Sequence, residues 1–181
     1  RKMKNDIYAA LDKTGRQGRS SKNRVDVLNY HALSRQIIMK YGLVSFGSKV
    51  DTNVLTPMNE SRVLSYFQNK RIPLSKQDNQ ILNSFSKAVN QADSTSIDGL
   101  IDQYYDLIIK KLIPSGCITY NAILILAIKI LKNNQSICNL YRSLYPYVIV
   151  DEAQDTNLLG YRLFTCIVSD RTRICMFGDS L

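Results

Sequence analysis

The feature that most constrains the fold is a short apolar run, Tyr147 to Val150, which ends abruptly in two adjacent carboxylates, Asp151 and Glu152. The run is aromatic and β-branched and is too short to form a helix of its own, so it favours a buried strand. Ligands of parallel sheets bind just beyond the carboxyl ends of the strands. The pattern therefore predicts an α/β fold in which both carboxylates face a crevice at the sheet edge.

Two carboxylates at the end of a hydrophobic strand suit nucleotide hydrolysis. One carboxylate at this position holds Mg²⁺ on the phosphates in P-loop nucleotide hydrolases. A second carboxylate beside it can accept the proton of the attacking water. This interpretation assigns Asp151 to the metal and Glu152 to the general base. The alternative is a strand that happens to stop at an acidic turn, because such a short motif also occurs by chance.

Composition limits the class of protein. The 181 residues, with 45% hydrophobic and 22% charged side chains, suit one globular domain or one domain with an insertion. His31 is the only histidine, and the four cysteines, which include Cys175, are widely spaced. We expect no zinc site, and we expect the cysteines to be small core residues of a reducing compartment. No apolar run is long enough to span a bilayer and no signal peptide opens the chain, so the predicted location is cytoplasmic.

Positive charge is concentrated at the start of the chain. The net charge is +9, and the segment from Arg1 to Arg24 holds eight basic and two acidic residues. Such a balance favours a polyanionic partner. The alternative is a solvated helix followed by a flexible loop.

The first part of the chain mixes helix and strand patterns. Apolar spacing predicts a helix over Lys2–Lys13, a short strand over Arg24–Leu28 and a second helix over Ala32–Tyr41. Gly42 is expected to end that second helix. The polar and Gly-containing stretch from Val44 to Asn59 is interpreted as a connection.

No strand pattern occurs between Ser61 and Leu112. Amphipathic helices are predicted over Ser61–Lys70, Gln77–Gln91 and Ile97–Leu112, the last with Ser96 as its N-cap. An all-helical stretch within an α/β pattern is best interpreted as an insertion. We therefore divide the chain into a first α/β segment (1–45), a helical insertion (46–115) and a second α/β segment (116–181).

The α/β pattern resumes at Cys117. Thr119 is expected to cap a helix that is apolar almost all round and therefore buried. Three helices are predicted in this segment: Tyr120–Leu131, Ser136–Leu144 and one that follows Asn157 and runs through Val168. Ile174 to Phe177 is then a second buried strand that also stops at a carboxylate, Asp179. Acidic residues would thus follow two strands at the same edge of the sheet.

Together these residues resemble the UvrD/Rep-type superfamily 1 DNA helicases. Asp151 to Asn157 resembles the Walker B region, motif II, in which D-E-x-Q-D-T-N follows a hydrophobic strand. Ile174 to Asp179 resembles the next strand and the opening of motif III, G-D-x-x-Q. Leu28 to Leu33 is similar to the T-F-H-S/A-L segment that contacts single-stranded DNA. Arg1 to Lys13 is similar to the helix after motif Ia, and Ile118 to Leu124 is similar to an L-D-F-D-D-L-type helix start.

The resemblance implies part of a RecA-like P-loop NTPase sheet with a helical insertion, and ATP-driven movement along single-stranded DNA, usually 3′ to 5′. It implies that Asp151 binds Mg²⁺ and that Glu152 activates water. Gln154, Asp155 and Asp179 would couple the state of the bound ATP to the rest of the site. Asn29, Tyr30 and His31 would face single-stranded or partly duplex DNA, on which a flat ring stacks without reading sequence.

The chain also departs from the family pattern. It contains no G-x-x-x-x-G-K-[ST] loop, and Leu181 is its last residue, one position before the glutamine of motif III. Asn29 and Tyr30 replace the usual Thr and Phe. We interpret the chain as a piece of a longer polypeptide, cut after motif Ia and inside motif III, that depends on the remaining protein and hydrolyses no ATP alone. Two alternatives are a helicase-like subunit of a nuclease or DNA-defence complex and an ATPase-dead DNA-binding module.

Overall fold

The computed structural model describes residues 26–47 and 50–179. Seven α-helices occur among these residues: α2 (Tyr30–Phe46), α3 (Glu60–Asn69), α4 (Lys76–Asn90), α5 (Ser94–Leu107), α6 (Tyr120–Asn133), α7 (Gln135–Leu144) and α8 (Leu158–Ile167). The strands are β1 (Thr56–Met58), β2 (Cys117–Thr119), β3 (Tyr147–Val150) and β4 (Arg173–Met176). The mixed α/β class with parallel strands is as predicted. The expected helix at Lys2–Lys13 and the basic segment lie outside the described residues.

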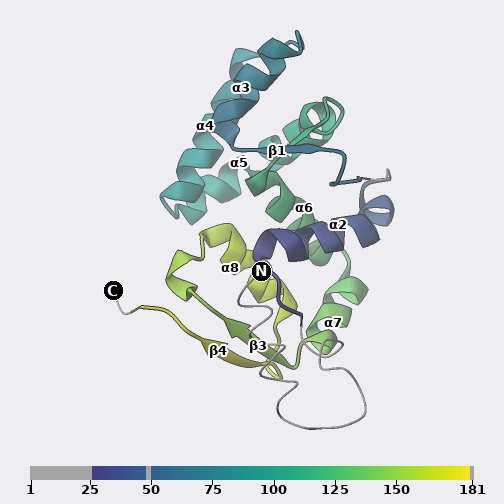
Figure 1. Ribbon diagram of the computed structural model, residues 1–181, viewed down its shortest axis with the longest axis vertical. Helices are drawn as coiled ribbons and strands as arrows, with labels where there is room; N and C mark the ends of the chain where they lie inside the picture. The colour runs from purple at the N-terminus through teal and green to yellow at the C-terminus, as the bar shows by residue number, and fades with distance from the viewer. Residues whose placement is uncertain (1–25, 48–49, 180–181) are drawn as a thin grey trace.

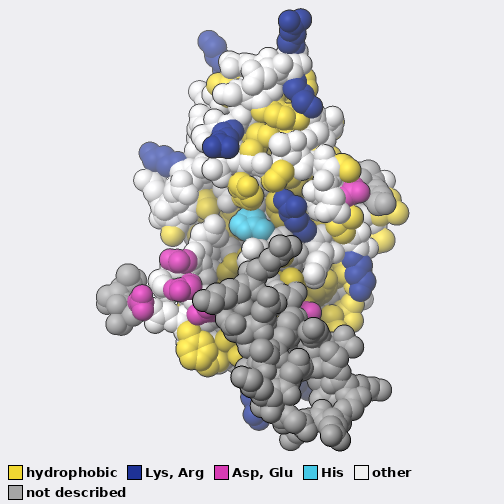
Figure 2. Space-filling view, viewed as in Figure 1, with side chains coloured by type: hydrophobic (Ala, Val, Ile, Leu, Met, Phe, Trp, Pro, Cys, Tyr) yellow, Lys and Arg dark blue, Asp and Glu magenta, His cyan; other side chains and the backbone are white. Residues whose placement is uncertain are grey.

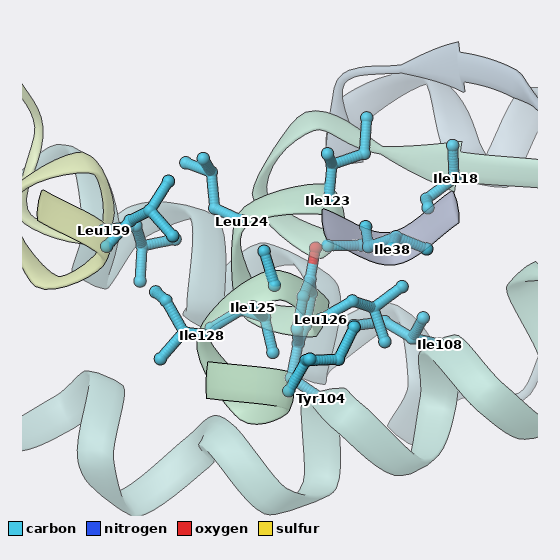
Figure 3. Packing of buried hydrophobic residues seen from close by; sticks show 14 of the residues in the cluster. Ile38, Tyr104, Ile108, Ile118, Ile123, Leu124, Ile125, Leu126, Ile128 and Leu159 are labelled. Atoms are coloured by element: carbon cyan, nitrogen blue, oxygen red, sulfur yellow. The ribbon is translucent and has the colours of Figure 1, made fainter. Parts of the chain in front are cut away.

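Helix α6 is the centre of the core. Nine of its residues are buried, which confirms the prediction from its apolar sequence. The hydroxyl oxygen of Thr119 caps the helix by accepting a hydrogen bond from the Ala122 N–H at 3.1 Å. Figure 3 shows side chains of α6 between Tyr104 and Ile108 on one side and Leu159 of α8 on the other. Helix α6 therefore packs against residues on both of its sides and holds the two parts of the core together.

The remaining elements form two groups around α6 (Figure 1). Helices α3, α4 and α5 lie together at the top of the view. Helix α2 crosses α6 in the middle, and α7, α8, β3 and β4 lie below. Of the elements next to the predicted site residues, α2 and α8 thus pack directly on α6.

A short parallel pair, β1 and β2, corrects the prediction that residues 44 to 59 only connect. Thr56 pairs with Cys117 and Met58 with Thr119. Neither strand has a recognisable alternation, because each is only three residues long and β1 contains Pro57. In sequence, α3, α4 and α5 lie between these two strands.

A buried polar cluster joins α5 to the start of α3 and the end of β2. The Tyr104 side chain is completely buried, and its hydroxyl donates a hydrogen bond to Glu60 Oε1 at 2.6 Å. The same hydroxyl lies 2.5 Å from Thr119 Oγ1. The Tyr104 ring stacks on Phe85 of α4 with centroids 3.9 Å apart. Burial of these polar groups is therefore compensated by hydrogen bonds, as packed interiors require.

The predicted end of α2, the predicted N-cap of α5 and the strand predicted before α2 were wrong. Helix α2 runs through Gly42 to Phe46, because Gly42 is buried and packed, and Gly47 ends the helix in the left-handed conformation at φ 69°. The described part of the expected first strand, residues 26–28, has no regular structure. Ser96 does not cap α5. Asp93 does so, and its Oδ1 accepts from the Ser96 N–H at 3.0 Å.

Strands β3 and β4 form as predicted, but the prediction that they are buried was wrong. Tyr147 is 65% exposed, Ile149 is 72% exposed and Met176 is 51% exposed. The exposed Cys175 likewise corrects the expectation of four core cysteines. A strand is buried on both faces only where other elements cover both, and within 26–47 and 50–179 these two strands form a sheet of their own. Among the same residues, none of the helices has the length and apolar character needed to cross a membrane.

Candidate functional site

The candidate site lies where β3 and β4 end. The strands are parallel neighbours, with Val150 paired to Met176. Asp151 and Asp179 follow these strands, so the structure places both residues at the same end of the sheet. Figure 2 shows acidic side chains gathered at the left of this face, where Figure 1 shows the carboxyl ends of the two strands.

Backbone hydrogen bonds continue beyond the strands and fix the two acidic segments against each other. The Phe177 N–H donates to the Val150 carbonyl at 2.8 Å. The Ala153 N–H donates in turn to the Phe177 carbonyl at 2.9 Å. A side chain on Gly178 would overlap the Gln154 amide oxygen and lie 3.3 Å from the Ala153 nitrogen. Gly178 therefore permits the close approach of these two segments.

Glu152 has an unusual backbone conformation. Its φ of 50° and ψ of 49° lie in the left-handed region, which non-glycine residues seldom adopt. Its carboxylate accepts a hydrogen bond from Gln154 Nε2 at 2.7 Å. A short 3-10 turn, η3 (Ala153–Asp155), follows at once and turns the chain toward α8. The side chain of the predicted general base is thus hydrogen-bonded to Gln154, a second predicted site residue.

The donor set at this edge suits a magnesium ion that is shared with phosphates. Asp151, Glu152 and Asp155 are all exposed, and carboxylate oxygen is a preferred ligand of Mg²⁺. In the part of the chain that the structure describes, no group of three or more His, Cys, Asp or Glu residues is arranged to hold a metal ion. Mg²⁺ commonly binds one or two carboxylates and completes its shell with water and substrate phosphates. The exposed carboxylates fit that mode of binding.

The predicted DNA-facing residues occupy the first turn of α2. Asn29 is its N-cap, and its side-chain oxygen accepts from the Ala32 N–H at 2.8 Å. The Tyr30 hydroxyl lies 3.3 Å from Thr156 Oγ1 in motif II. The Tyr30 ring lies beside Gly160 of α8, only 3.2 Å from where a side-chain carbon on that glycine would stand. Tyr30 therefore packs directly against the motif II segment.

His31 lies beside an aromatic residue that the sequence analysis did not single out. Its ring meets the ring of Tyr120 edge-on, with centroids 5.6 Å apart. Tyr120 is 41% exposed, and Figure 2 shows the histidine at the centre of the visible face. Burial lowers the pKa of His31, and the charge of Arg35 lowers it further. Tyr120 is an aromatic residue at the first position of an otherwise buried helix. That signal in the sequence would have identified it as a further candidate residue of the site.

Helix α8, which follows motif II directly, is also tied to α5. Arg162 contacts Asp98 through two hydrogen bonds, Nη1 to Oδ1 at 2.5 Å and Nη2 to Oδ2 at 3.1 Å. Arg162 Nη2 also donates to Ser94 Oγ at 2.5 Å. The bond from Arg162 holds the pKa of Asp98 below its usual value. Sequence pattern did not reveal this contact, because the partners are 64 residues apart.

Comparison with known proteins identifies the family. The family model of the UvrD/REP helicase N-terminal domain matches residues 3–180. The chain is 25% identical over 165 residues to the ATP-dependent DNA helicase Rep of Buchnera aphidicola, an alignment that covers 87% of this chain and 24% of that protein. It is 21% identical over 193 residues to the ATP-dependent DNA helicase PcrA of Bacillus subtilis, covering 94% of this chain and 26% of PcrA.

A third relative, the probable DNA helicase II homolog of Mycoplasma capricolum, is 30% identical over 94 residues, which are 52% of this chain and 13% of that protein. The chain thus spans about a quarter of the length of the Rep and PcrA relatives that it matches. The family match covers nearly the whole chain and agrees with the resemblance of its motifs. The chain belongs to the UvrD/REP helicase N-terminal domain family.

Proposed function

We propose that this chain supplies the nucleotide-hydrolysing carboxylates and part of the DNA-binding surface of an ATP-dependent DNA helicase or translocase. The observation that carries the proposal is the parallel pairing of β3 with β4, after which Asp151 and Asp179 follow at one edge. The names of the Rep and PcrA relatives, both ATP-dependent DNA helicases, support the same class of activity.

Each residue at the edge has a proposed role. Asp151 would hold Mg²⁺, which neutralises charge on the phosphates of ATP when it is bound. Glu152 would take a proton from the attacking water, and its bond with Gln154 would keep its carboxylate in place. Asp155 and Asp179, together with Gln154, would couple the state of the nucleotide to the rest of the site. The exposure of these carboxylates leaves them accessible to a ligand.

The DNA-facing side is joined to this edge by one direct contact. Asn29, Tyr30 and His31 begin α2 and are proposed to face the DNA strand. The Tyr30 hydroxyl touches Thr156, which lies in motif II. We therefore propose that a change of conformation at the carboxylate edge is transmitted through this contact to the residues that face DNA.

We also propose that residues 46–115 act as a helical insertion between two segments of a RecA-like domain, 1–45 and 116–181. Two features support this division. All the helices from α3 to α5 lie between β1 and β2 in sequence, and these strands pair with each other. In Figure 1 the same helices stand apart from β3 and β4.

The experiment that tests the proposed function is the substitution Glu152→Gln in the full-length protein. The amide cannot accept a proton from water, so we expect ATP hydrolysis to be abolished while nucleotide binding is retained. Binding of a fluorescent ATP analogue and release of phosphate are measured on the same preparation. Asp106→Asn removes an exposed carboxylate on α5 as a control and should hydrolyse ATP like the parent. If Glu152→Gln hydrolyses ATP at nearly the parent rate, Glu152 is not the general base.

A further inference from the structure

A second candidate site lies at the opposite end of β3 and β4 from the carboxylates. A half-open cavity of about 440 Å³ is lined there by Arg142 and Ser143 of α7, by Pro146 before β3 and by the turn Ser169–Thr172 before β4. Figure 1 shows α7 and the starts of both strands together at the bottom of the view. Because the two sites lie at opposite ends of the strands, a ligand in this cavity would not compete for the carboxylates.

Arg142 is held in place from one side only. Its Nε donates to the Cys166 carbonyl at 3.1 Å, and the Cys138 thiol donates to the same carbonyl at 3.2 Å. This bond orients the guanidinium of a half-buried side chain. Among the residues described, the two terminal nitrogens of Arg142 have no hydrogen-bond partner. They remain available as a pair of parallel donors, the geometry that matches phosphate oxygens.

The opposite wall is a rigid turn that presents a second arginine. The Thr172 N–H donates to the Ser169 carbonyl at 2.9 Å, and the Ser169 N–H donates to Thr172 Oγ1 at 3.0 Å. The Arg171 N–H donates to Ser169 Oγ at 3.4 Å. These bonds fix the backbone on both sides of Arg171. The Thr172 hydroxyl also lies 3.4 Å from Ser169 Oγ, where either hydroxyl can donate; when Ser169 donates, the Thr172 hydrogen is available to a ligand.

The charge balance of the cavity favours an anion. Two guanidinium groups line it against one carboxylate, that of Asp170. The ion pairs found between described residues include neither arginine and not Asp170, so the carboxylate does not neutralise the guanidiniums by direct contact. The volume is in the range of sites for small ligands. A phosphate group fits the charge and the donors, and the volume leaves room for the molecule that carries it.

We propose that Arg142, Arg171 and Thr172 form a phosphate-binding site at the amino ends of β3 and β4. The phosphate belongs either to a free phosphorylated molecule or to the backbone of a DNA strand, and both present the same oxygens to the arginines. The site is independent of ATP hydrolysis at the opposite edge, so it does not rest on the proposed function.

The test is chemical labelling of arginine with phenylglyoxal, followed by peptide mass spectrometry of the full-length protein. Nucleotide and Mg²⁺ are omitted, so a defect at the carboxylate edge does not affect the result. The probes are pyrophosphate and a short single-stranded oligonucleotide. We expect both probes or pyrophosphate alone to protect Arg142 and Arg171, while Arg62, an exposed arginine on α3, is labelled equally with and without probe. Protection by the oligonucleotide assigns the site to DNA phosphate, and protection by pyrophosphate alone assigns it to a free phosphorylated ligand.

A matched pair of variants makes the test quantitative. In Arg171→Gln, the pyrophosphate concentration that half-protects Arg142 should rise about tenfold, because one charge-assisted contact to the phosphate is lost. In Arg62→Gln it should equal that of the parent. Labelling of Arg142 and Arg171 that is the same with and without either probe overturns the proposal. An Arg171→Gln variant that is half-protected at the parent concentration does so as well.

Discussion

Glu152 combines a proposed catalytic role with an unfavourable backbone conformation. At φ 50° and ψ 49° its Cβ crowds the following carbonyl, a conformation that costs about 1 kcal/mol for an ordinary residue. Only glycine adopts it without that cost. Residues in such conformations cluster at functional sites, where the surrounding structure holds them. Here the strand end on one side and η3 on the other fix the conformation of Glu152.

The first prediction concerns the stability of this position. Glu152→Gly and Glu152→Ala both remove the carboxylate and its bond with Gln154, but only glycine relieves the left-handed strain. We expect Glu152→Gly to be more stable than Glu152→Ala by about 1 kcal/mol. Urea denaturation of the two variants measures the difference in the free energy of unfolding. Equal midpoints would mean that the residue relaxes out of the left-handed region at no cost.

His31 gives a second prediction at the same scale. Burial and Arg35 lower its pKa below the ordinary value of 6.5, so the native ring resists protonation that the unfolded chain accepts. The unfolded state then binds more protons, and stability should fall as the pH is lowered from 6.5 toward the native pKa. His31 is the only histidine of these 181 residues, so its ring signals in a proton NMR titration of this chain give the native pKa directly. A midpoint at or above 6.5 would contradict the burial seen in the structure.

At the scale of elements, long amphipathic patterns were predictable and short strands were not. Helices α6 and α8 begin within a residue or two of the predicted positions, because Thr119 and Asn157 are recognisable caps. Strands β1 and β2 are too short to show a period. Gly42 has the appearance of a helix stop, but it is buried against the rest of the protein and α2 continues through it to Phe46. Local signals therefore failed where tertiary contacts decided the outcome.

The Tyr104 cluster provides the prediction at this scale. It joins α5, the start of α3 and the end of β2, and its bond to the buried Glu60 is 2.6 Å long. Tyr104→Phe keeps the ring stacked on Phe85 but leaves that buried carboxyl group without the donor. We expect a loss of about 1 to 3 kcal/mol in the free energy of unfolding. The measurement is urea denaturation of the parent and the variant.

The neighbouring residue supplies the control for this prediction. Tyr105 is half-buried, and no hydrogen bond of its hydroxyl to a described residue is found, so Tyr105→Phe should change stability by less than about 0.5 kcal/mol. A similar loss in both variants would show that the hydroxyl of Tyr104 contributes nothing specific.

At the scale of the whole molecule, the exposure of the β3–β4 sheet could not be predicted. The residues from Tyr147 to Val150 have the composition of a covered strand, but composition does not state what covers it. The prediction that Asp151 and Asp179 follow neighbouring strands did not depend on burial, because parallel order alone brings the strand ends together. The arrangement of the candidate site was therefore more predictable than the environment of the strands that form it. The Arg162–Asp98 contact, in turn, depends on how α5 and α8 pack, which local sequence does not reveal.

The last prediction concerns the stability of the whole fold at alkaline pH. Burial raises the pKa of Tyr104 well above 10, raises that of Tyr141 to about 12 and also raises that of Tyr145, with Asp26 adding to the shift of the last two. Unfolded tyrosines ionise near 10, so above that pH the native state retains protons that the unfolded state releases. The contribution of these tyrosines to stability should therefore be constant below pH 10 and fall as the pH rises from 10 toward 12.

Urea midpoints measured at intervals between about pH 8 and 11 test this expectation. Tyr141→Phe removes one ionisable group and should make the alkaline decline less steep, because the unfolded chain then releases one proton fewer. Tyr161→Phe, at an exposed position on α8, is the matched control and should decline as the parent does. A parent protein whose midpoint stays unchanged up to pH 11 would show that these hydroxyls ionise in the native state as freely as in the unfolded chain. Tyr141 of α7 would then not pack against α2, nor Tyr145 against the core, as the structure shows.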